Sequence, residues 1–183
     1  EIAGNGKDDD GNGFVDDVHG YDFADDDSDP GPGSGHGTHV AGIAAGAGNN
    51  GTGATGTAWH ASIMALKTFS DDGTGYISDS VSAFNYAAMM RRTYGVNVRV
   101  TNSSWVTDQY VSSLRTALKA DGDAGILTVA AAGNGSYNVD SAPLYPAAFD
   151  LNTIISVAGT DRYDNLADFS VWGPNTVDLA APA

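Results

Sequence analysis

The chain contains 183 residues, 42% of them hydrophobic, which is enough to build a folded core and excludes disorder throughout. Its net charge of −15 argues against nucleic acids and anionic membranes as partners. No apolar run has transmembrane length, no signal peptide is visible, and cysteine is absent. We expect one domain over 1–183, and we expect it to be a fragment or processed piece.

Acidic residues are concentrated at the start of the chain, where 1–29 hold 11 of the 23. Such crowding of like charge calls for a screening cation or for water. Counted from Asp8, oxygen-bearing side chains stand at the first, third and fifth places and Gly13 at the sixth, as in the first part of an EF-hand loop. His19 occupies the twelfth place, where an EF-hand has its closing Glu. The predicted Ca²⁺ ligands are Asp8, Asp10, Asn12, the carbonyl of Phe14, and Asp16. The alternative is a solvated acidic turn.

A glycine-rich loop that leads into a helix follows this acidic region. Residues 35–42 are Gly-His-Gly-Thr-His-Val-Ala-Gly, and apolar residues at helical spacing predict a helix over 37–47. His36 then lies at the start of this helix, where a neutral imidazole can act as a general base. Two alternatives are a structural histidine and a metal site with His39, although the zinc-protease spacing and glutamate are missing.

The rest of the chain alternates predicted strands with predicted helices. Apolar runs predict strands at 61–69, 96–101, 126–132 and 153–158. Helical spacing predicts a helix from Ile77 onward, with Ser78 as its N-cap, and another around 110–118. This order predicts an α/β fold with a mainly parallel sheet, in which functional sites lie beyond the carboxyl ends of the strands.

Two polar segments follow predicted strand ends and are expected to share one crevice. These are residues 102–105 and the pair Gly133 and Asn134. The side-chain amide of Asn134 can donate a hydrogen bond to a developing oxyanion, although Gly-Asn-Gly is also ordinary turn chemistry.

Four segments, in order, resemble the subtilisin-like serine proteases (subtilases, peptidase family S8). They are the histidine motif at 35–42, Asn-Ser-Ser-Trp at 102–105, Ala-Ala-Ala-Gly-Asn at 130–134, and Ala-Asp-Phe-Ser at 167–170 with Leu-Ala-Ala-Pro at 179–182. The resemblance implies a three-layer fold, with His36 as catalytic base and Asn134 as oxyanion donor. It implies a second calcium ion in the loop after the first helix, with the Asn50 side chain as a ligand. The implied substrate-binding residues are Asn102, Ser103, Ser104, Trp105, Val106, Ala131 and Gly133.

The sequence departs from the family pattern in three places. The catalytic Asp and Ser motifs are not found, and Asp22 is interpreted as structural or calcium-linked. Val106 and Thr107 replace glycines beside the substrate strand, which should narrow the cleft for a substrate side chain. Ala183 stands where glycine commonly follows Ala-Pro.

These observations predict a fragment of a secreted, calcium-binding serine endopeptidase. The expected organisation is a single partial peptidase domain, with a calcium-binding loop region at 1–33 and an α/β core at 34–183. We expect protein or peptide substrates, a monomer when complete, and no activity from this segment alone. The alternative is a non-catalytic pseudoprotease or a calcium-stabilised peptide-binding domain.

Overall fold

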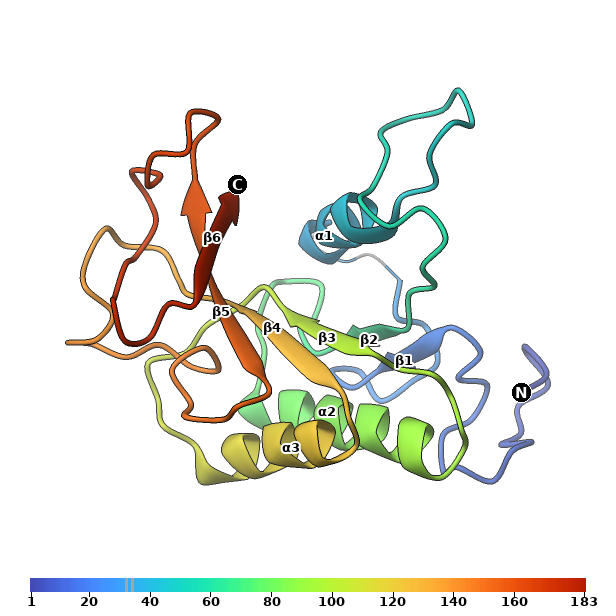
Figure 1. Cartoon of the computed structure of the whole chain (residues 1–183). Coiled ribbons are helices and arrows are strands. Elements are labelled where there is room, and N and C mark those ends of the chain that lie inside the picture. The colour runs from blue at the N-terminus through green and yellow to red at the C-terminus, as the bar shows by residue number, and fades with distance from the viewer. Residues whose placement is uncertain (32, 34) are drawn as a thin grey trace. The chain divides into compact units, whose positions relative to one another are not determined.

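The computed structural model describes residues 1–31, 33 and 35–183, and its elements are labelled in Figure 1. The chain divides into two compact units, Glu1–Ala83 and Phe84–Ala183, and the division falls inside helix α2 (Ile77–Arg92). The predicted boundary at 33/34 touches Ser34, which lies outside the described residues.

The first unit contains a short parallel pair of strands and helix α1. Strand β1 (Gly20–Asp22) pairs with β2 (Ala65–Lys67), and Gly20 lies opposite Ala65. A Cβ on Gly20 would lie 1.9 Å from the Ala65 carbonyl oxygen, so only glycine permits this close approach. Strand β1 was not expected, because its three residues lie within acidic loop sequence.

Three predictions about element boundaries in this unit were wrong. The strand expected at 61–69 is only three residues long, and the preceding Ile63 is 50% exposed rather than buried. The helix predicted at 37–47 is α1 (His36–Ala45). It ends there because Gly46, whose N–H still bonds to the Gly42 carbonyl, has a non-helical ψ of 130°. Ser78 is not an N-cap, since α2 already begins at Ile77.

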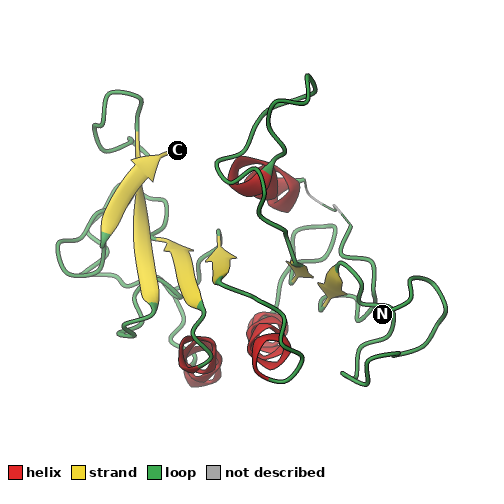
Figure 2. Cartoon of the chain, turned by 45° about the vertical axis from the view of Figure 1, so that its right-hand side comes forward, coloured by secondary structure: helices red, strands yellow, loops and turns green. Residues whose placement is uncertain are grey.

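The second unit is built on a four-stranded, wholly parallel sheet (Figure 2). The strand order follows the chain: β3 (Val100–Ser103), β4 (Leu127–Ala131), β5 (Ile154–Thr160) and β6 (Leu179–Pro182). Helix α3 (Ser112–Asp123) connects β3 to β4. The predicted parallel sheet is therefore confirmed, although β6 was not among the expected strands and β3 begins four residues later than the expected strand at 96–101.

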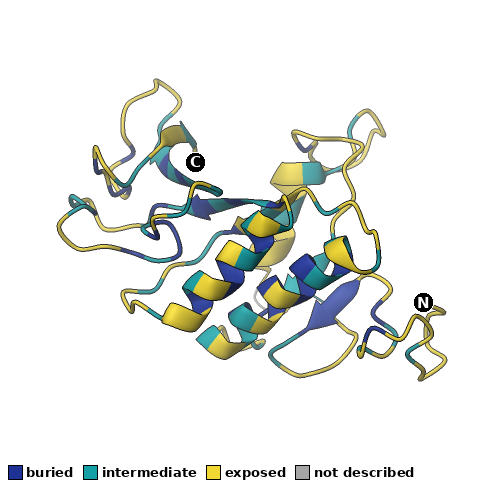
Figure 3. Cartoon of the chain, turned by 60° about the horizontal axis from the view of Figure 1, so that its bottom comes forward, coloured by how far each residue is buried: buried dark blue, intermediate teal, exposed yellow. Residues whose placement is uncertain are grey.

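The core of this unit lies between the sheet and its helices. Helix α3 buries one face, including Leu114 and Leu118, which are fully buried, and Figure 3 shows the exposed face opposite it. Arginines at the end of α2 cap the end of α3, since Arg91 Nε donates to the Ala124 carbonyl and Arg92 Nη2 to the Ala120 carbonyl. A second apolar cluster, Ala132, Val139, Leu144 and Val171, lies just beyond the end of β4.

Candidate active site

His36 is the first residue of α1, and its backbone is set by the glycine before it. Gly35 adopts the left-handed conformation with φ 77°, which lets the chain turn directly into the helix. The His36 side chain is exposed and pairs with no carboxylate among the described residues. None of the residues of α1 is buried. The imidazole therefore lies at a helix N-terminus, open to solvent within its unit.

The far end of α1 is held by the segment that returns past it. Thr57 N–H donates to the Ile43 carbonyl and Ala58 N–H to the Ala44 carbonyl, which satisfies carbonyl groups that a helix end otherwise leaves unpaired. A Cβ on Gly56 would lie 2.2 Å from the Gly46 nitrogen, so this contact requires glycine. The helix that carries His36 is thus fixed by backbone contacts rather than by a packed apolar face.

Asn134 lies in a loop directly beyond strand β4. A Cβ on Gly133 would lie 2.3 Å from Leu144 Cδ1, and Gly133 has φ 124°, so a side chain fits there neither sterically nor conformationally. The Asn134 side chain is exposed, and its amide forms no hydrogen bond with any described residue. It is consequently available to donate to a ligand.

The predicted substrate strand forms the edge of the sheet in the second unit. Asn102 and Ser103 are the last residues of β3, and Ser103 lies opposite Ala130 of β4. The Asn102 side chain is exposed and donates to Ser104 Oγ at 3.0 Å. Trp105 is half-buried and Val106 is 40% exposed.

The parallel register brings most of the predicted substrate residues together. Because β3 and β4 run parallel with Ser103 opposite Ala130, the chain leaves both strands at the same end of the sheet, so residues 104–106 follow β3 where Gly133 and Asn134 follow β4. After Val106 the chain pairs with another segment, because Thr107 and Tyr145 form two backbone hydrogen bonds of 2.8 Å with each other. Strand β3 is an edge strand of the sheet in this unit, and an extended peptide can add to an edge strand as a further strand.

In the acidic loop the predicted calcium ligands Asp8 and Asp10 lie close together, whereas Asp16 lies apart from them. Carboxylate oxygens of Glu1, Asp8 and Asp10 lie within 4.8 Å of one another. The Asp8 carboxylate accepts three backbone N–H groups, from Gly11, Asn12 and Gly13. These donors stabilise the charged carboxylate and lower the Asp8 pKa, and the bond from Gly13 at 2.8 Å contributes most to this shift. Glu1 was missed by sequence reasoning, since nothing in the spacing marks a residue seven positions before Asp8.

The other predicted ligands of this loop make local contacts. The Asn12 amide nitrogen donates to Asp10 Oδ2 at 3.3 Å and to Asp17 Oδ2 at 2.8 Å. The Asn12 side-chain oxygen accepts the Phe14 N–H at 2.7 Å. Asp16 instead accepts the N–H groups of Asn5 and Gly6 and lies outside the cluster of described carboxylates around Asp8.

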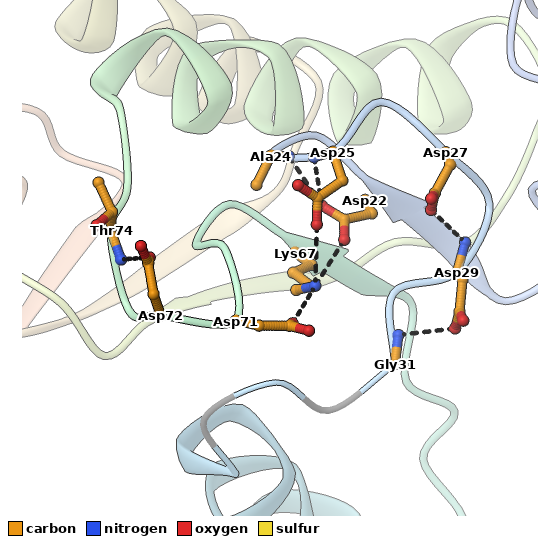
Figure 4. Close-up of polar contacts among 10 residues, drawn as sticks. All are labelled: Asp22, Ala24, Asp25, Asp27, Asp29, Gly31, Lys67, Asp71, Asp72 and Thr74. Carbon is orange, nitrogen blue, oxygen red and sulfur yellow. Dashed lines mark hydrogen bonds and ion pairs between the residues drawn. The ribbon is translucent and has the colours of Figure 1, made fainter.

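Asp22 has a structural role that sequence reasoning left open. It is 1% exposed, accepts the Ala24 and Asp25 N–H groups on Oδ1, and contacts Lys67 Nζ at 2.8 Å through Oδ2. Figure 4 shows the Lys67 ammonium group between Asp22, Asp25 and Asp71. Hydrogen bonds to Asp22 and then to Asp71 raise the Lys67 pKa. In the sequence, the feature that pointed to this ion-pair network was Lys67, a charged residue inside the apolar run at 61–69.

The Subtilase family model matches residues 1–183 in full. The chain belongs to the subtilase family. It is 41% identical to "Thermitase" of Thermoactinomyces vulgaris, over 90% of this chain and 55% of that protein. It is 39% identical to "Thermophilic serine proteinase" of Bacillus sp. (strain AK1), over 90% of this chain and 38% of that protein.

A solved structure supports the subtilase fold. The crystal structure of a cold adapted subtilisin-like serine proteinase matches with a TM-score of 0.74 and 31% identity, over 89% of this chain and 54% of that one. The expected three-layer α/β fold is thereby confirmed. This subtilase chain spans between about a third and about half of the length of the relatives that it matches. None of its described helices is both long and apolar enough to cross a bilayer.

Proposed function

We propose that the full-length protein is a secreted, calcium-binding subtilase that cleaves peptide bonds through an acyl-enzyme. The supporting observation is that, in a subtilase fold, the parallel register of β3 and β4 sets residues 102–106 and Asn134 at the same carboxyl end of the two strands. Secretion is supported by relatives such as "Halolysin-like extracellular serine protease Nep" of Natrialba magadii, which is 38% identical over 90% of this chain.

The proposed chemistry assigns roles to two side chains. His36 takes the proton of a serine hydroxyl as it attacks the peptide carbonyl and later returns it to the leaving amine. Asn134 donates a hydrogen bond to the oxygen that becomes negatively charged during the attack. The substrate lies along β3, main chain to main chain, as an added strand. The serine and the carboxylate that orients His36 are assigned to no residue of 1–183.

The acidic loop supports the calcium part of the proposal. The carboxylates of Glu1, Asp8 and Asp10 lie together and are hard oxygen donors of the kind that Ca²⁺ prefers. Asn12, Asp16 and the Phe14 carbonyl belong to the proposed ligand set on the spacing of the sequence alone. When bound, the ion would neutralise mutual repulsion in this loop. For Asn50 the support is the family resemblance alone, because its side-chain oxygen accepts the Thr52 N–H in an exposed turn.

The experiment uses the full-length protein with casein as substrate. We expect cleavage that a serine-directed inhibitor abolishes, and background activity for His36→Ala. Asn134→Ala should lower kcat by about 10²–10³ with little change in KM, because this donor acts on charge that develops in the transition state. His60→Ala, an exposed histidine of the same unit, is the control and should retain full activity. Cleavage that survives His36→Ala would overturn the assignment.

The alternative is a pseudoprotease that binds peptides without cleaving them. Such a protein would lack the catalytic Asp and Ser motifs of the family, neither of which is matched by a residue of 1–183. The sequence of the longer protein discriminates, because an enzyme requires a strand ending in Asp-Thr/Ser-Gly before the histidine motif and a later Gly-Thr-Ser segment. Casein binding without cleavage would support the alternative. For the complete protein we propose a monomer, which its elution volume in gel filtration tests.

A further inference from the structure

The loop that carries Asn134 is paired with a second segment of the chain, residues 169–171. Asn134 lies opposite Ser170 in an antiparallel bridge. Two backbone hydrogen bonds flank this pair, from Gly135 N–H to the Phe169 carbonyl at 2.8 Å and from Val171 N–H to the Gly133 carbonyl at 3.2 Å. The backbone is therefore bonded to one short partner segment both directly before and directly after Asn134.

The side chain of Ser170 anchors this partner segment to the sheet. It is 1% exposed, and its hydroxyl both accepts and donates a hydrogen bond. Ser170 Oγ accepts the Gly159 N–H of β5 at 2.9 Å and donates to the Val171 carbonyl at 2.9 Å. One hydroxyl thus connects a strand of the sheet to the segment that pairs with Asn134.

The backbone around Asn134 requires such a restraint. Its neighbours Gly133 and Gly135 have φ values of 124° and 140°, which only glycine adopts readily, and glycine gives the chain wide conformational freedom. A hydrogen-bond donor for an oxyanion is effective only when its position is fixed before the reaction. The restraint must come from outside the loop, and Ser170 lies where it can provide it.

We propose that Ser170 is a positioning residue for Asn134, acting through the backbone pairing and not through contact with the substrate. The inference rests on the proposed role of Asn134 as oxyanion donor. Ser136 adds a second, exposed attachment between the same two segments, since its hydroxyl donates to the Asp168 carbonyl.

The test is a double-mutant cycle in the full-length enzyme with a peptide substrate. Ser170→Ala should lower kcat by about tenfold or more and leave KM nearly unchanged, because small displacements of a catalytic group are costly. In the Asn134→Ala background, the same change should alter kcat by less than about twofold, since the group being positioned is gone. Ser156→Ala is the control, as this fully buried serine on β5 forms no side-chain hydrogen bond with any described residue.

Ser136→Ala repeats the cycle at an exposed position and carries the test if Ser170→Ala does not fold. It should show the same coupling to Asn134 with a smaller loss of kcat. Equal losses in both backgrounds, or a Ser170→Ala enzyme with normal kcat, would overturn the proposal while Asn134→Ala remains impaired. If Asn134→Ala itself has normal kcat, the proposed oxyanion role fails and the positioning role fails with it.

Discussion

At the scale of single residues, Asp121 is the most unusual group in the chain. It is fully buried on α3, and neither carboxyl oxygen accepts a hydrogen bond of normal geometry. The nearby Thr101 hydroxyl is paired with Thr128 Oγ1 at 3.0 Å across β3 and β4. Burial raises the pKa of Asp121 to about 7, and Thr101 and Arg92 oppose this shift only in part.

Asp121 should make the protein less stable as the pH rises from about 4 to about 7. The unfolded chain loses the proton near its ordinary pKa of 3.8, whereas the folded chain retains it until about 7. Over this interval the folded state binds more protons, so the free energy of unfolding falls with pH. The full effect above pH 7 is roughly 4 kcal/mol at 1.4 kcal/mol per pKa unit.

Urea unfolding of the full-length protein at several pH values between 4 and 8 measures this slope. Asp121→Asn should flatten it. Asp123→Asn is the matched control, because Asp123 lies on the same helix but is exposed and paired with Lys119, and its lowered pKa acts below this interval. A slope that persists in Asp121→Asn would mean that another group titrates.

At the scale of secondary-structure elements, one lysine holds β1 and β2 together. Lys67 of β2 contacts the buried Asp22 of β1 at 2.8 Å, and two further carboxylates surround its ammonium group. Lys67→Met should lower the free energy of unfolding by about 3–5 kcal/mol, because it leaves the buried Asp22 carboxylate without a counter-charge. Thermal melts measure the loss.

The control for Lys67 is the exposed Lys119–Asp123 pair on α3, also at 2.7–2.9 Å. Lys119→Met should leave the melting temperature nearly unchanged, because water screens surface pairs. Similar losses for both variants would show that burial does not strengthen the contact with Asp22.

The acidic loop gives a second prediction at this scale. Saturating Ca²⁺ should raise the melting temperature of the full-length protein relative to a chelator, because a ligand that binds only the folded state stabilises it. Asp8→Asn or Asp10→Asn should reduce this shift, whereas Asp108→Asn, an exposed acid of the other unit, should not. Identical melts with and without calcium, with no heat of binding in calorimetry, would refute the calcium site.

The sequence predicted elements well where periodicity was strong, as at α2, α3, β4 and β5. It missed β1 and β6, because strands of three or four residues in polar or small-residue sequence leave no alternating pattern. The common location of the segments after β3 and β4 was predictable, since the carboxyl ends of parallel strands lie at the same end of a sheet. The contacts of Ser170 and Glu1 were not, because no periodicity or motif in the sequence relates Ser170 to Gly159 or Glu1 to Asp8 and Asp10.

At the scale of the whole molecule, the two side chains that we propose to be catalytic, His36 and Asn134, supply only part of what the proposed chemistry requires. His36 has no carboxylate partner among the described residues to fix its tautomer, and no serine in 1–183 matches the nucleophile segment of the family. An oxyanion donor without a nucleophile retains at best about 10³–10⁴ over water, which is negligible for peptide bonds. We therefore predict that residues 1–183 alone do not cleave casein.

The isolated segment should also be poorly folded. Among the described residues of the first unit the sheet has two strands, which is marginal by itself, and Ile43, Trp59 and Ile63 are 48–57% exposed. We expect the segment to bind a hydrophobic dye or to aggregate, and the full-length protein to melt cooperatively. Expressing both forms side by side and assaying casein cleavage tests this. Strong cleavage by the segment that is lost on His36→Ala would place the nucleophile within these residues.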